Sequence, residues 1–196
     1  MKTETGKSLL EQRTFLPDLL DDHAPLKALP KGTVGRTYVE FMEREGLTAH
    51  GLVEESLTQR QAHEHDDLLW YINRLRDTHD MYHVLTGYGR DALGEASLLG
   101  YTHSQHGGAG VSFIAFMGAR EIAKAAPRDA RVKDVIAEGR RNGKAAKRII
   151  EQDIISLLDQ PINEVRKRLN IAEPLLYKRA LKVFQEAGQD PQLGAA

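Results

Sequence analysis

Apolar residues recur along most of this chain at spacings of three and four, which is the period of an α-helix with one buried face. A few β-branched runs occur, but none alternates with polar residues between turn signals in the way that predicts a strand. The sequence contains no internal repeat and no low-complexity segment. The pattern therefore predicts an all-α fold, organised as a single-domain helical bundle.

The two best-defined helices are separated by a short loop that contains glycine. The first is expected from about Asp66 to Thr86 and ends before Gly87, a residue suited to the left-handed conformation at a helix end. Asp91 can cap the second helix, which is expected to run to about Gln105. Because the connection is so short, the two helices should pack as antiparallel neighbours and form a helical hairpin.

Turn residues and periodicity predict helices elsewhere, with boundaries good to about two to four residues. They are expected at Thr33–Glu45, Gly51–Arg60, Val111–Lys124, Asp129–Leu158 with an interruption near Gly143, Pro161–Leu169 and Pro174–Gly188. Thr33 suits the cap of its helix, Gly46 lies beyond the end of that helix, and Pro161 suits a first turn.

Two histidines continue the apolar stripe of the helix that precedes the loop. Leu68, Ile72 and Leu75 follow one another at spacings of four and three, and the next positions on that stripe are His79 and His83. Histidines at i and i+4 share one helix face, with Cβ atoms roughly 5–6 Å apart. Both imidazoles can therefore reach one metal ion through bonds of about 2.0–2.1 Å.

Two carboxylates can complete this site. His83 lies about one turn before the loop and Glu95 about one turn after it, so an antiparallel hairpin brings them to similar height. Glu95 shares its helix face with the apolar Leu98, and a buried glutamate is costly unless it is paired or binds metal. Asp80 can be a further ligand, or an acceptor that orients the imidazole of His79. The predicted metal ligands are thus His79, Asp80, His83 and Glu95.

Two imidazoles and two carboxylates form a mixed nitrogen and oxygen donor set, which suits a divalent zinc, iron or manganese ion better than magnesium. Two plainer interpretations stay open at this point. A histidine on an apolar helix face is often a hydrogen-bonded core residue that binds no metal. Asp80 could also pair with Arg76, four residues earlier on the same helix.

Composition narrows the classes of function. The 196 residues suit one ordinary domain, and the 41% of hydrophobic residues suffice for a folded core. With 27 basic and 28 acidic residues, nucleic acid is not an expected partner. The absence of cysteine excludes disulfides, thiolate nucleophiles and cysteine-bound zinc. The N-terminus is too polar for a secretory signal, and no segment reaches the roughly 20 apolar residues of a membrane span.

Other groups with potential chemistry have plainer explanations. His63 and His65 are expected in solvent, and a second metal site at His103 and His106 is disfavoured. The apolar run Val111–Met117 is expected in the core, with a groove for an apolar tail as the alternative. The main basic cluster consists of Arg140, Arg141, Lys144, Lys147 and Arg148. We interpret this cluster as a solvated helix face, with recognition of an anionic head group as the alternative.

The run HDMYHVLTGYGRDALGE resembles the signature of the ubiquinone (coenzyme Q) biosynthesis protein Coq-four family. In that signature HDxxH is followed after eleven residues by E, and the matching positions here are His79, Asp80, His83 and Glu95. The resemblance extends over roughly residues 30 to 174. Its flanking residues are Tyr71, Arg74, Arg76, Gly94-Glu95-Ala96, Gly35-Arg36-Thr37-Tyr38, Phe41-Met42, Asn142-Gly143-Lys144-Ala145 and Leu158–Leu169.

This resemblance implies an all-helical fold, a metal at the motif and a role in the biosynthesis of coenzyme Q or a related prenylquinone. Residues 30–173 would form the family's helical core domain, preceded by an N-terminal segment (1–29) and followed by a C-terminal helix and tail (174–196). The implied activity is metal-dependent oxidative decarboxylation or hydroxylation at a carbon of a prenylated hydroxybenzoate-type ring.

The resemblance also implies partners: a prenylated quinone precursor or prenyl lipid, and other enzymes of quinone biosynthesis. We expect a cytoplasmic protein that can lie peripherally on the inner membrane, and a homo-oligomer is compatible with the sequence. Two rival functions stay open. One is a non-catalytic scaffold that binds prenyl lipids and organises the biosynthetic enzymes, and the weaker one is a helical metal-dependent phosphohydrolase.

Overall fold

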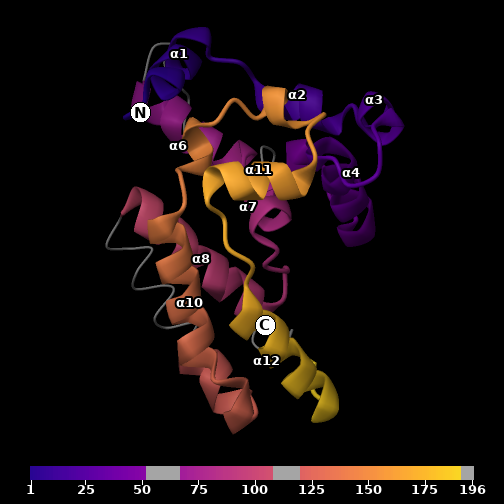
Figure 1. Cartoon of the computed structure of the whole chain (residues 1–196), viewed down its shortest axis with the longest axis vertical. Coiled ribbons are helices and arrows are strands. Elements are labelled where there is room, and N and C mark those ends of the chain that lie inside the picture. The colour runs from indigo at the N-terminus through magenta and orange to yellow at the C-terminus, as the bar shows by residue number, and fades with distance from the viewer. Residues whose placement is uncertain (52–66, 108–119, 191–196) are drawn as a thin grey trace. The chain divides into compact units, whose positions relative to one another are not determined.

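The computed structural model describes residues 1–51, 67–107 and 120–190, and every regular element within these ranges is helical (Figure 1). In the same part of the chain, an isolated antiparallel bridge joins Thr33 and Pro161. The predicted all-α fold is confirmed. None of the described helices is long and apolar enough to cross a membrane.

The chain forms two compact units, each built from two separate stretches of sequence. The first comprises residues 1–85 and 148–165, and the second comprises residues 86–147 and 166–196. The first unit contains α1 (Glu4–Gln12), α2 (Leu16–Asp21), α3 (His23–Ala28), α4 (Val34–Glu45), α6 (Asp67–Asp77), α7 (His79–Thr86), the 3-10 turns η2 (Ile149–Glu151) and η3 (Ile155–Leu157), and α11 (Ile162–Leu169). The second contains α8 (Ala92–His106), η1 (Arg128–Ala130), α10 (Val132–Ala145) and α12 (Leu175–Glu186). Helices α7 and α11 begin in the first unit and end in the second.

Helix α4 has the start and the end that its sequence predicts. The Thr33 side chain accepts a hydrogen bond from the backbone N–H of Arg36, and Gly46 ends the helix with a φ of 67°. Tyr38 and Met42 lie on its buried face, with 1% and 0% of their surfaces exposed. The helices predicted after Pro161 and Pro174 are confirmed as α11 and α12.

The three short helices at the N-terminus were not predicted from the periodicity. Helices α2 and α3 have six residues each, which is too few for a stable isolated helix in water. They persist because Leu16, Leu20 and Leu26 are buried in the first unit. Tertiary packing, rather than local preference, therefore decides this stretch.

The single helix predicted from about Asp66 to Thr86 is wrong, because the chain is interrupted at Thr78 between α6 and α7. The Thr78 hydroxyl donates a hydrogen bond of 2.7 Å to the Arg74 carbonyl oxygen, four residues earlier. Such a bond from a threonine side chain competes with the helical pattern and bends helices. Helix α7 therefore begins at His79.

The prediction that the apolar stripe before the histidines faces the core is also wrong. Leu68 and Ile72 expose 64% and 46% of their surfaces. The buried residue of α6 is instead Arg74, which is 3% exposed. Its guanidinium donates hydrogen bonds of 2.8 and 2.7 Å to the carbonyl oxygens of Ile150 and Gln152, and these bonds stabilise the buried charge.

Of the helix predicted over Asp129–Leu158, the interruption expected near Gly143 is confirmed, because α10 ends at Ala145, but the continuous helix predicted beyond it is wrong. The predicted range forms η1, α10, η2 and η3, because the backbone is extended at Ala146 and leaves the helical path there. The N–H of Lys147 donates to the carbonyl oxygen of Leu169 at 2.8 Å. Ile149 and Ile150, the next apolar pair, are fully buried in the first unit.

The helix predicted near Gly51–Arg60 lies almost wholly outside the described residues. Of the helix predicted at Val111–Lys124, the described part begins at residue 120 and is helical.

Helices α8 and α10 lie side by side in the second unit and approach closely through glycine (Figure 1). A Cβ atom on Gly143 would clash with the carbonyl oxygen of Tyr101, and a Cβ atom on Gly139 would clash with that of Ser97. Because backbone cannot yield as a flexible side chain does, this packing depends on the absence of side chains at both glycines.

Replacing Gly143 with alanine should therefore destabilise the protein, although the same change usually favours a helix interior by about 0.5–1 kcal/mol. We expect Gly143→Ala to lower the free energy of unfolding by about 1–3 kcal/mol, the usual effect of overpacking. Urea denaturation measures this difference. Lys144→Ala, at the exposed neighbouring position, is the matched control and should stay within about 0.5 kcal/mol of wild type. A Gly143→Ala protein as stable as wild type would contradict close backbone packing.

A histidine joins α2 to the segment that follows α4 in the first unit. The His50 ring lies between two carboxylates of α2, with Nδ1 2.5 Å from Asp21 and Nε2 3.1 Å from Asp18. Asp21 also accepts hydrogen bonds from the backbone N–H groups of Ala49 and His50. The hydrogen bond with Asp21 raises the pKa of His50. Burial by itself would raise the pKa of Asp21. The hydrogen bonds from His50 and from the two backbone amides outweigh burial, so the pKa of Asp21 is lowered.

The raised pKa of His50 predicts a dependence of stability on pH. A histidine whose pKa is higher in the folded state contributes stability that is fully present below its unfolded pKa of about 6.5, and this contribution is lost as pH rises through the folded value. Urea denaturation between pH 5 and 9 should therefore show a smaller decline above neutral pH for His50→Gln than for wild type. His103→Gln serves as the control for a histidine elsewhere. Identical pH profiles for wild type and His50→Gln would show that the contacts of His50 with Asp18 and Asp21 contribute nothing to the free energy of unfolding.

Candidate metal centre

Helix α7 carries three of the four predicted ligands in its first two turns. The imidazole rings of His79 and His83 lie edge to face, with centroids 4.8 Å apart and planes at 70°. His83 is buried, with 1% of its surface exposed, whereas the His79 side chain is 37% exposed. The pair therefore has one inner member fixed in the core and one outer member that solvent can reach.

The inner histidine is held by α4. The ring of Phe41 stacks on the His83 imidazole with centroids 5.7 Å apart and planes at 19°. The guanidinium of Arg44 lies over the same phenyl ring, 5.3 Å from its centroid. This stacking restricts the rotation of His83 and so presets the direction of its nitrogens.

Asp80 is buried beside the histidine pair, with 5% of its surface exposed. One of its oxygens lies 3.5 Å from Nδ1 of His79. Burial, followed by the charge of Asp80, raises the pKa of Tyr38 on α4. Arg76, which was considered as a partner for Asp80, contacts Asp77 at 2.8 Å. Asp80 is thus placed to orient the imidazole of His79.

The fourth predicted ligand, Glu95, lies in the first turn of α8. Asp91 caps this helix as predicted, because its side chain accepts a hydrogen bond from the backbone N–H of Gly94 at 3.0 Å. The positive end of the helix dipole favours a carboxylate such as that of Glu95 in the first turn. Its side chain is half-buried.

His79, His83 and Glu95 form a candidate metal-binding triad. Each offers one ligand atom, and the three atoms lie within 4.8 Å of one another. Two imidazole nitrogens and one carboxylate oxygen are a donor set that zinc, iron and manganese accept, so the residues fit a divalent metal. Three protein ligands, unlike four, leave room for a further ligand such as water or substrate. Asp80 is not a member of this triad.

The remaining candidates divide into those that the structure describes and those that it does not. His63, His65 and the run Val111–Met117 lie outside the described residues. His103 and His106 belong to the last turn of α8 and are not part of the triad. Within the basic cluster, the prediction of a solvated face holds for the exposed residues Arg140, Arg141, Lys144 and Lys147. It does not hold for Arg148, which contacts Glu151 at 2.5 Å and the Tyr71 hydroxyl at 3.0 Å.

Two residues beside the site were missed at the level of sequence. Phe41 gives no signal of its role, because one aromatic residue on an amphipathic helix is usually ordinary core. Tyr177 on α12 contacts the loop before α8, although nearly ninety residues separate the two in sequence. A single sequence carries no pattern that indicates a contact of that range.

Comparison with known proteins agrees with the resemblance seen in the sequence. The model of the family described as coenzyme Q (ubiquinone) biosynthesis protein Coq4 matches residues 1–175. The match thus includes the N-terminal helices and ends at the first residue of α12.

Individual relatives support the same assignment. The mitochondrial ubiquinone biosynthesis protein coq4 of Penicillium rubens is 26% identical over 93% of this chain. The corresponding protein of Ajellomyces dermatitidis is 28% identical over 92% of it. The chain spans 62% and 61% of the lengths of these two relatives. Both relatives are named as mitochondrial, whereas the sequence led us to expect a cytoplasmic protein.

A solved structure has the same fold. The crystal structure of a protein assigned to ubiquinone biosynthesis from Nostoc punctiforme superposes with a TM-score of 0.68. The two proteins are 24% identical, and the superposition covers 88% of this chain and 77% of the other.

Proposed function

Because the chain belongs to the coenzyme Q (ubiquinone) biosynthesis protein Coq4 family, we propose that it acts in the biosynthesis of ubiquinone or a related prenylquinone. We further propose that His79, His83 and Glu95 hold a divalent metal, and that the site catalyses oxidative decarboxylation or hydroxylation of a ring carbon in a prenylated aromatic precursor. The observation that carries this proposal is the convergence of two imidazoles and one carboxylate within 4.8 Å.

The chemistry that such a metal supplies when bound is Lewis acidity toward a hydroxyl or carboxylate oxygen of the ring. The chain's own residues determine how that chemistry is used. The buried His83, stacked on Phe41, would hold the metal from the core side of the site. The half-exposed His79 lies on the side from which a substrate can approach.

Asp80 serves the site by orienting His79. A carboxylate next to a ligating imidazole fixes the tautomer and the direction of the ring and makes the ligand nitrogen more basic. The distance of 3.5 Å between Asp80 and Nδ1 of His79 is longer than a normal hydrogen bond. Metal binding at Nε2 would favour the tautomer with a proton on Nδ1, the nitrogen that faces Asp80.

Elemental analysis and turnover, measured on the same preparations, test this proposal. Purified wild type should contain close to one equivalent of zinc, iron or manganese, and His79→Ala, His83→Ala and Glu95→Ala should each lose it. His103→Ala is the matched control, because it removes an imidazole from the same helix as Glu95 and should keep the metal. Asp80→Asn should retain the site with about 10–100-fold weaker affinity, the usual effect of losing an orienting partner.

Turnover is measured under molecular oxygen, the two-electron acceptor that the reaction requires, as release of carbon dioxide and formation of hydroxylated product from a prenylated hydroxybenzoate. The wild-type protein should be active and Glu95→Ala inactive, because both its metal and its activity depend on the same carboxylate. Normal turnover by a metal-free Glu95→Ala protein would refute the proposal. A protein that binds metal and prenyl lipid, yet converts no ring substrate, would instead support the scaffold role.

A further inference from the structure

Tyr177, near the start of α12, joins that helix to the first turn of α8 within the second unit. Its hydroxyl donates a hydrogen bond to Oδ2 of Asp91 and accepts one from the backbone N–H of Gly89 at 2.9 Å. The other oxygen of Asp91 accepts the N–H of Gly94 at 3.0 Å and so caps α8. One carboxylate therefore connects the phenol of α12 with the N-terminus of α8.

The loop before α8 is shaped to admit this hydroxyl. A Cβ atom on Gly89 would lie 2.5 Å from the hydroxyl oxygen of Tyr177 and 2.9 Å from Oδ2 of Asp91. A Cβ atom on Gly94 would clash with the carbonyl oxygen of Gly89. Only the absence of both side chains lets the loop lie against the first turn of α8 and the phenol lie against the loop.

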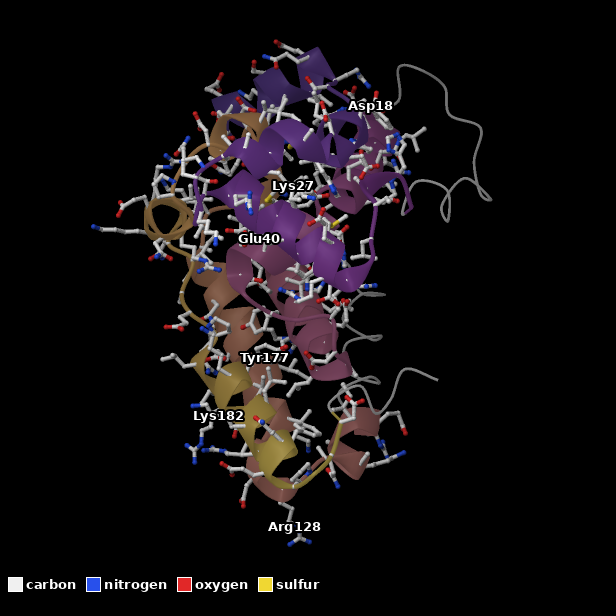
Figure 2. All side chains as sticks on the ribbon, turned by 90° about the vertical axis from the view of Figure 1, so that its right-hand side faces the viewer. Asp18, Lys27, Glu40, Arg128, Tyr177 and Lys182 are labelled. Atoms are coloured by element: carbon white, nitrogen blue, oxygen red, sulfur yellow. The ribbon has the colours of Figure 1, made fainter. Side chains whose placement is uncertain are left out.

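Tyr177 is itself held in place by its own unit. Glu138 on α10 accepts hydrogen bonds from the backbone N–H groups of Leu176, at 3.0 Å, and of Tyr177, at 3.3 Å. The Tyr177 ring packs edge to face against Tyr88, with centroids 5.4 Å apart, and is 3% exposed. Figure 2 labels Tyr177 on α12 together with Lys182, an exposed residue of the same helix. These contacts fix the position of the Tyr177 hydroxyl, which in turn holds the loop before α8 through its hydrogen bonds.

The phenol remains a hydrogen-bond donor over the accessible pH range. Burial, followed by the charge of Asp91, raises the pKa of Tyr177. The hydroxyl therefore keeps its proton and keeps donating it to the carboxylate. A phenylalanine at this position would preserve the ring packing and remove only the two hydrogen bonds.

Glu95 directly follows the turn that these contacts fix. Its backbone N–H donates to the carbonyl oxygen of Asp91 at 2.9 Å, and its neighbour Gly94 is bound by the Asp91 side chain. The direction in which the Glu95 side chain leaves α8 depends on how this turn is held. We propose that Tyr177 is a positioning residue for Glu95, acting through Asp91 and Gly89. This inference rests on the metal-binding role proposed above for Glu95.

The experiment compares the metal-free full chain in four forms: wild type, Tyr177→Phe, Phe184→Leu and Glu95→Ala. Each is titrated with Zn²⁺ against a chromophoric chelator, and with Co²⁺ as an absorbing probe of the ligand shell. We expect Tyr177→Phe to bind Zn²⁺ about 10–100-fold more weakly than wild type, the range seen when an indirect support of a ligand is lost. Its Co²⁺ spectrum should also shift, because the carboxylate is displaced.

Phe184→Leu is the matched control for the stability of α12. Phe184 is 2% exposed on the buried face of the helix, and the change should lower the Tm while Zn²⁺ affinity stays at the wild-type value. Amide hydrogen exchange gives a readout that needs no metal. The amides of residues 94–96 should exchange faster in Tyr177→Phe than in wild type or Phe184→Leu.

The outcomes separate the two proposals. If Glu95→Ala abolishes Zn²⁺ binding while Tyr177→Phe binds and exchanges like wild type, the positioning role is wrong and the metal site stands. An equal loss of affinity in Phe184→Leu would also overturn the positioning role, because it would trace to the stability of α12 alone. Wild-type Zn²⁺ affinity in Glu95→Ala would overturn the metal site, and the positioning role would fall with it.

Discussion

The burial of polar side chains in and next to α7 is the constraint on which the rest of the first unit depends. Thr78, Asp80 and His83 expose between 0% and 5% of their surfaces. Moving a polar group from water into a protein interior costs about 1–3 kcal/mol unless it is hydrogen-bonded, and a charge costs more. These buried side chains therefore need hydrogen-bond partners and close packing within the unit. The stacking of Phe41 on His83 is one such packing contact. A metal ion that takes up the imidazole nitrogens would offset part of the cost. Proteins retain such locally unfavourable groups mainly where function requires them.

The second unit meets a different requirement, which is to fix the first turn of a helix through close backbone contact. Helices α8 and α10 approach through Gly139 and Gly143, and the loop before α8 approaches its first turn through Gly94. These contacts leave little freedom to the residues between them. Glu95 directly follows Gly94 in the turn that this packing holds.

Local chemistry explains which parts of the fold could be predicted from the sequence. The caps at Thr33 and Asp91 follow from side-chain oxygens that bind N–H groups two or three residues away, and both are confirmed. The histidine pair likewise follows from helical spacing. The interruption at Thr78 was not predicted, because the spacing of apolar residues does not indicate whether a threonine hydroxyl will bond to the carbonyl oxygen four residues earlier. The burial of Arg74 could not be predicted either, because its acceptors lie more than seventy residues further along the chain. Patterns within one window indicate candidate ligands by type and spacing, whereas long-range contacts decide how those side chains are held.

We propose that the two imidazoles and the carboxylate bind a single ion. X-ray absorption spectroscopy at the edge of the co-purifying metal tests it most directly, because imidazole rings produce a characteristic outer-shell scattering. We expect two imidazole ligands in wild type, with nitrogen and oxygen donors at about 2.0–2.2 Å, and one imidazole in His79→Ala. A metal shell that contains no imidazole, or one that is unchanged in His79→Ala, would contradict it.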